Sequence, residues 1–167
     1  LKEKDVFAEQ GIRYVAPLVA LADPAQVPKQ LFRALDGVLP GLTLDETRRA
    51  VDDGYRTLAA FDREMRARSR KVLEWCAREE RACIMVLARP YHMDPGIGHE
   101  IEADLQAYGY PVLWLQYFPT DLDLLEWIFE ADMRDGFMKS VFDIADVWPS
   151  SYSANTNEIL WGAKVAA

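Results

Sequence analysis

Residues 83–100 read CIMVLARPYHMDPGIGHE, and this stretch decides the fold that the sequence predicts. It opens with an apolar run of strand length, continues as a polar loop and ends where a helix begins. In an open α/β sheet, ligands bind beyond the carboxyl ends of the strands, which is where such a loop would lie. Both histidines of the chain, His92 and His99, lie in this stretch. We therefore expect a functional site to be centred on it.

The residues on either side predict a βαβ unit. Continuous apolar composition predicts buried parallel strands at 82–87 and 111–115, with a helix over 99–108 between them. The fold class is therefore α/β, with a small, mainly parallel, Rossmann-like sheet and flanking helices. Periodicity and turn residues predict further elements: helices over 28–35, 120–133 and 153–167, and an edge strand over 12–19.

A long amphipathic helix is predicted before the βαβ unit. Thr43 and Glu46 fit a capping box at its start, and no proline interrupts the pattern as far as Glu79. Its apolar stripe either binds a partner, as in a homodimer, or packs across its own domain. We expect residues 1–81 to form an N-terminal strand and helical arm and residues 82–167 the βαβ segment, both belonging to one domain excised from a longer protein.

Composition and charge restrict the class of protein. The 167 residues are 50% hydrophobic and 28% charged, without an apolar run of membrane-spanning length, and polar residues at the start predict no signal peptide. Two cysteines form no disulfide framework, which predicts a cytoplasmic setting. The net charge of −8 argues against a nucleic-acid partner. Arginines crowd the long helix, where we expect them to pair with acidic side chains.

Arg89 and its neighbours form the first group of candidate site residues. A guanidinium at the carboxyl end of a buried strand could hold a carboxylate or a phosphate, or it could brace the loop by pairing with Asp94 or Glu100. Tyr91 and His92 can exchange hydrogen bonds, and His92 can also transfer a proton.

The second group lies where the loop meets the following helix. Gly96 and Gly98 could admit a ligand to the helix end, with His99 beside it as a second candidate for proton transfer, or Asp94 and the glycines could only shape the turn. A third segment, residues 146–157, is rich in hydroxyl and amide groups. It either reaches the same sheet edge or caps the last helix. The candidate ligand-binding residues are Arg89, Tyr91, Asp94, Gly96, Gly98, Glu100, Ser151, Tyr152 and Asn155, and the candidate catalytic residues are His92 and His99.

Known cofactor motifs match poorly. Gly96 and Gly98 supply two glycines of a dinucleotide fingerprint, but Ile101 stands where the third belongs. The histidines match no zinc pattern, and Cys76 and Cys83 are interpreted as buried thiols. We therefore expect no metal and no cofactor in this segment itself.

Three blocks of the sequence resemble one known family. They are residues 88–101 (ARPYHMDPGIGHEI), 109–113 (GYPVL) and the pair 146–148 (DVW) with 151–157 (SYSANTN). They resemble the large CoA-substrate-specific enzyme activase proteins, also described as activator-like proteins of the 2-hydroxyacyl-CoA dehydratase system. The similarity covers most of the chain, and its first block is the specific one. Ala88 stands where the family pattern often has glycine.

The resemblance implies a long multidomain protein. One part is an ATPase of sugar-kinase-like fold with an iron–sulfur cluster that drives low-potential electron transfer, and another part is similar to the cluster-holding dehydratase subunits. This chain resembles that second part or the piece between, and we expect the cluster cysteines outside it. The expected cofactors of the longer protein are the iron–sulfur cluster and ATP, and the expected partners are its other domains and an acyl-CoA dehydratase.

Two functions follow as expectations. In the first, the segment contributes to an iron–sulfur cluster or acyl-CoA binding region and is inactive alone. In the second, it is a non-catalytic interaction module that docks neighbouring domains through the long helix.

Overall fold

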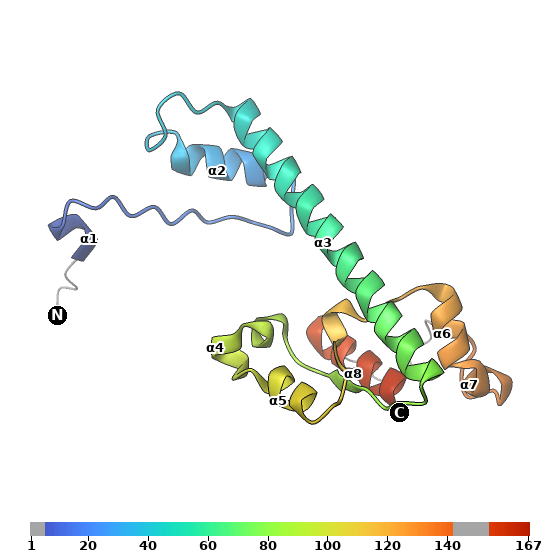
Figure 1. The fold of residues 1–167 in the computed structure, drawn as a ribbon. Helices are drawn as coiled ribbons and strands as arrows, with labels where there is room; N and C mark the ends of the chain where they lie inside the picture. Colours follow the sequence, from blue (N-terminus) through green and yellow to red (C-terminus); the bar gives the residue numbers. More distant parts are fainter. Residues whose placement is uncertain (1–5, 142–153) are drawn as a thin grey trace. The chain divides into compact units, whose positions relative to one another are not determined.

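The computed structural model describes residues 6–141 and 154–167 (Figure 1). The chain forms two compact units, Leu1–Ala60 and Phe61–Ala167, so the division lies inside the long helix. The elements are α1 (Val6–Glu9), α2 (Val27–Leu35), α3 (Leu44–Arg78), β1 (Ile84–Val86), η1 (Pro90–Met93), α4 (Pro95–Gly98), α5 (Ile101–Ala107), β2 (Val112–Trp114), η2 (Leu115–Tyr117), α6 (Leu122–Ile128), α7 (Glu130–Arg134) and α8 (Ala154–Ala166).

The first unit contains an irregular segment where the sequence predicted an edge strand over 12–19, and that prediction is wrong. Among the described residues the backbone there pairs with no strand, Pro17 carries no N–H to donate, and the side chain of Leu18 is 93% exposed. Long-range hydrogen bonds hold the chain that follows instead. The Ala20 N–H donates to the Gln30 side chain over 2.8 Å, and the Tyr55 hydroxyl donates to the Leu21 carbonyl over 3.3 Å.

Helix α3 begins and ends within one residue of its prediction, and its start is a reciprocal capping box. The Glu46 carboxylate accepts from the Thr43 N–H over 2.9 Å, and the Glu46 N–H donates to the Thr43 hydroxyl over 3.2 Å. Several of its arginines pair with acidic residues three or four positions away, as expected. The pairs are Arg48–Asp45, Arg56–Asp53, Arg68–Glu64 and Arg70–Glu74.

In the second unit, the βαβ prediction is confirmed. Strands β1 and β2 run parallel, with Met85 opposite Leu113, and η1, α4 and α5 connect them. Each strand has three residues, which is shorter than the apolar runs that predicted them. The result is a small α/β fold whose sheet, in the described residues, has two strands.

The core of the second unit lies beyond the end of β2. Leu115, Phe118, Leu125 and Phe129 belong to one buried cluster, together with Met138 and Val141. Helix α8 covers part of this cluster, with the Trp161 ring 5.6 Å from the Phe118 ring in an edge-to-face contact. The helix predicted over 120–133 is divided into α6 and α7 at Phe129, whose side chain is buried in the core.

In the part of the chain that the structure describes, no helix combines the length and the apolar character needed to cross a membrane.

Candidate functional site

Arg89 lies in the loop after β1, and its side chain is exposed. Its backbone is extended, and Pro90 begins the short helix η1. The Arg89 carbonyl accepts the backbone N–H of His92 over 3.0 Å, so it is the main chain of Arg89 that shapes the turn. Among the residues that the structure describes, no carboxylate pairs with its guanidinium, and neither of the predicted bracing partners, Asp94 and Glu100, forms an ion pair with it.

Tyr91 and His92 form an aromatic pair next to Arg89. Their ring centroids are 4.4 Å apart with 34° between the planes, and Tyr91 is 53% exposed. The Nδ1 atom of His92 lies 3.2 Å from the Arg89 carbonyl oxygen. Because a carbonyl can only accept, Nδ1 carries the proton in this contact, and a neutral ring then presents Nε2 as an acceptor.

Asp94 shapes the turn into α4. Its Oδ1 atom accepts the N–H groups of Gly96 and Ile97 over 2.9 and 3.2 Å, which makes it the N-cap residue of that short helix. Gly98 allows a close approach within the loop itself, since an added Cβ would lie 2.0 Å from the His92 carbonyl oxygen. These contacts support the alternative in which Asp94 and Gly98 shape the turn and do not themselves bind a ligand.

His99 and Glu100 connect α4 to α5 in an uncommon conformation. Both have left-handed backbones, with φ of 56° and 54°, and both side chains are exposed. Left-handed non-glycine residues cost about 1–2 kcal/mol each, and such strain is concentrated at functional loops. The ring contact and the hydrogen bonds described above join Arg89, Tyr91 and His92 into one group that does not include His99 or Glu100.

Of the third candidate segment, Asn155 lies in the first turn of α8 with an exposed side chain. Ser151 and Tyr152 lie outside the described residues.

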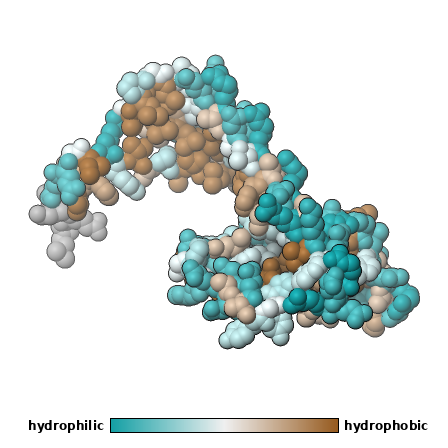
Figure 2. All heavy atoms as spheres, in the orientation of Figure 1, coloured by the Kyte–Doolittle hydropathy of each residue, from teal (hydrophilic) through white to brown (hydrophobic). Residues whose placement is uncertain are grey.

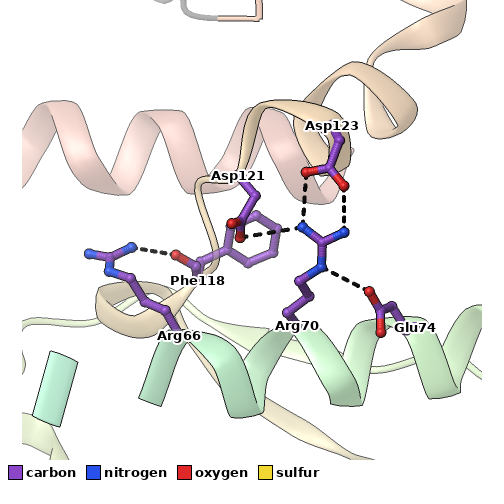
Figure 3. A network of polar contacts seen from close by, with 6 residues as sticks. All are labelled: Arg66, Arg70, Glu74, Phe118, Asp121 and Asp123. Atoms are coloured by element: carbon purple, nitrogen blue, oxygen red, sulfur yellow. Dashed lines mark hydrogen bonds and ion pairs between the residues drawn. The ribbon is translucent and has the colours of Figure 1, made fainter. Parts of the chain in front are cut away.

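A polar network that the sequence analysis did not single out joins α3 to the start of α6 (Figure 3). Arg70 of α3 donates from Nη1 to Asp123 Oδ1 over 2.9 Å and from Nε to Glu74 Oε1 over 2.8 Å. Asp121 lies 3.6 Å from the same guanidinium, and Arg66 donates to the Phe118 carbonyl. The sequence could indicate only the Arg70–Glu74 pair, through its i, i+4 spacing on a helix. The other contacts join residues more than fifty positions apart.

This network predicts that part of the stability of the fold is lost at acidic pH. The hydrogen bonds from Arg70 lower the pKa of Asp123 to about 2, below its value of about 3.9 in an unfolded chain. A depressed carboxylate pKa stabilises the folded state above the unfolded pKa, and that contribution is lost as the pH falls from about 4 to about 2. We expect Asp123→Asn to lower the stability at neutral pH and to flatten this acid dependence, measured by urea denaturation across that range.

Asp135→Asn is the matched control, because within residues 6–141 and 154–167 the Asp135 carboxylate forms an ion pair only with the adjacent, exposed Arg134. If both variants kept the wild-type acid dependence, the network would have no part in it.

Each unit also contains an apolar cavity. In the first unit, a cavity of about 620 Å³ is lined by α2 and the first turns of α3, including Leu31, Leu35 and Val51. Figure 2 shows hydrophobic atoms gathered over these elements. In the second unit, a cavity of about 290 Å³ is lined by Cys76, Cys83 and apolar side chains. These walls suit apolar groups, whereas the exposed Arg89 suits an anion.

The comparison with protein families supports the resemblance of the blocks at 88–101 and 109–113. Residues 2–118 match the family model described as the CoA enzyme activase uncharacterised domain (DUF2229). No curated protein and no solved structure matches the chain. The matched region includes α3, both strands and the whole of the Arg89 loop. The chain therefore belongs to the CoA enzyme activase uncharacterised domain family.

Proposed function

We propose that this chain is the CoA-recognising part of a CoA-substrate-specific enzyme activase of the 2-hydroxyacyl-CoA dehydratase system. In this proposal the Arg89 loop contributes to an acyl-CoA binding region in a protein that drives low-potential electron transfer with ATP. Membership of the CoA enzyme activase family supports the class of ligand. The observation that carries the proposal is the Arg89 guanidinium, which is exposed after β1 and is not paired with any described carboxylate.

The side chains beside Arg89 suit the chemistry of CoA. A guanidinium fork binds phosphate through two parallel hydrogen bonds, and CoA carries several phosphate groups. The exposed Tyr91 ring offers a stacking surface for the adenine base, and the free Nε2 of His92 offers an acceptor for a hydroxyl or amino group. Asp94 and Gly98 would then act indirectly, by holding the turn that presents these three side chains.

Acyl-CoA binding is better supported than cluster binding in this segment. An iron–sulfur cluster is held by several thiolates, and the chain has two cysteines. Residues 6–141 and 154–167 contain no group of three or more His, Cys, Asp or Glu side chains that could hold a metal ion. In the proposal, the cluster and the ATP site therefore belong to other parts of the longer protein.

Calorimetric titration with CoA itself tests the proposal. We expect Arg89→Ala to weaken CoA binding about tenfold or more, because hydrogen bonds to a charged group contribute roughly 1.5–3 kcal/mol. Binding should also weaken as salt is added, since surface charges are screened. The melting temperature should change little, because the Arg89 side chain contacts no described carboxylate.

Arg63→Ala is the matched control, since it removes an exposed arginine from α3 in the same unit. If the two variants lost affinity equally, only the net charge would matter. If the wild-type chain bound no CoA, the proposal would be wrong.

A further inference from the structure

The two cysteines of the chain meet at the turn between α3 and β1. Cys76 lies in the last turn of α3, and Cys83 directly precedes β1. The backbone reverses between them, because the Arg81 N–H donates to the Cys76 carbonyl over 2.9 Å and Glu80 adopts a left-handed conformation with φ of 51°. This turn places both cysteines on the wall of one cavity.

The thiols share one cavity but differ in accessibility. Both line the cavity of about 290 Å³ in the second unit, whose other walls include Leu73, Met85 and Trp127. No charged side chain lines it among the described residues. Cys76 is only 4% exposed, whereas Cys83 is half-buried. A small reagent can therefore reach Cys83 more readily than Cys76, which lines the same cavity.

We propose that Cys76 and Cys83 form a modification site for low-molecular-weight disulfides, in which Cys83 takes the modifying group and Cys76 displaces it. With oxidised glutathione, the Cys83 thiolate attacks one sulfur and releases one glutathione thiolate. The Cys76 thiolate then attacks the Cys83 sulfur, forms the Cys76–Cys83 bond and releases the second glutathione. The two cysteine thiols are oxidised, one glutathione disulfide is reduced to two thiols, and the two cysteine protons pass to the released thiolates.

The surroundings of the pair set the character of this reaction. Burial and the neighbouring Cys76 raise the pKa of the Cys83 thiol, so the first step is slow near neutral pH. The second step is favoured by proximity, because both thiols line the same small cavity. The product ties the end of α3 to the start of β1, the strand that leads to Arg89. The proposal is independent of CoA recognition.

Incubation of the chain with oxidised glutathione at mildly alkaline pH, followed by intact and peptide mass spectrometry, tests the order of events. The wild-type chain is expected to lose both thiols without retaining glutathione. Cys76→Ser is expected to keep glutathione on Cys83, because nothing displaces it. Cys83→Ser is expected to stay unmodified, because Cys76 is buried.

Three results would overturn the proposal. A stable glutathione adduct on wild-type Cys83 would show that Cys76 does not resolve it. Two free thiols in the folded chain, with rapid reaction in urea, would show that the pair is inert. A disulfide between two copies of the chain would show that the cysteines pair across molecules instead.

Discussion

Leu125→Ala is expected to lower the free energy of unfolding of the second unit by about 2–5 kcal/mol. The Leu125 side chain is 0% exposed and lies in the cluster formed by Leu115, Phe118 and Phe129. Truncation to alanine removes the transfer free energy of the lost methyl groups and leaves a cavity in the core. The neighbouring side chains can fill this cavity only partly, because α8 covers part of the cluster. Urea denaturation followed by tryptophan fluorescence measures this loss, because all five tryptophans belong to Phe61–Ala167.

Leu122→Ala is the control for this experiment. It makes the same chemical change on the same helix α6, but the Leu122 side chain is 52% exposed. A surface substitution of this kind usually changes stability by about 0.5 kcal/mol or less. Equal losses in the two variants would mean that burial of Leu125 does not set the loss, and that Leu125 does not belong to the core.

Elements that depend on local rules were predicted well from the sequence. Helix α3 has a capping box and no proline, so Thr43 and Glu46 fix its start without help from the rest of the chain. The βαβ unit was predicted because its two apolar runs are bounded by turn residues such as Gly109, which has a positive φ. In both cases the interactions that determine the element join residues that are close in sequence.

Features that depend on distant partners were predicted badly or missed. The apolar composition of 12–19 indicated a strand, but a strand needs a neighbour, and composition cannot supply one. The contact of Arg70 with Asp123 crosses fifty-three positions, and no spacing rule predicts it. The helix divides at Phe129, whose side chain is buried in a cluster with Leu115 and Phe118, and these partners are not visible in the local helical pattern.

The candidate site shows both cases within one loop. The sequence places Arg89 correctly at the end of a strand, because strand and loop are local features. It does not show whether Asp94 would pair with Arg89 or cap α4, because both uses suit a carboxylate. In the structure Asp94 caps the helix, which leaves the Arg89 guanidinium exposed. To assign a function to such a loop, one must therefore know which of its polar groups are already engaged in hydrogen bonds within the fold.

Gly98→Ala is expected to destabilise the turn by about 1–3 kcal/mol, the range typical of overpacked sites. Helix propensity alone predicts the opposite sign, because alanine stabilises a helix by up to about 1 kcal/mol relative to glycine. The added Cβ would lie 2.0 Å from the His92 carbonyl oxygen, and both atoms are fixed to the backbone. The backbone must therefore move, and His92 must move with it. Urea denaturation and hydrogen exchange at the Gly96 and Ile97 amides measure these effects.

Gly96→Ala separates this steric effect from a general intolerance of the loop. Its added Cβ would lie 3.1 Å from Asp94 Oδ1, a side-chain atom that can shift by a few tenths of an ångström. We therefore expect a small change in stability and continued protection of the Ile97 amide. If both variants were equally stable, the close approach at Gly98 would have no energetic consequence. Gly98→Ala leaves Arg89 in place. If this variant weakened CoA binding and Gly96→Ala did not, the result would show that the turn positions the Arg89 guanidinium for the ligand.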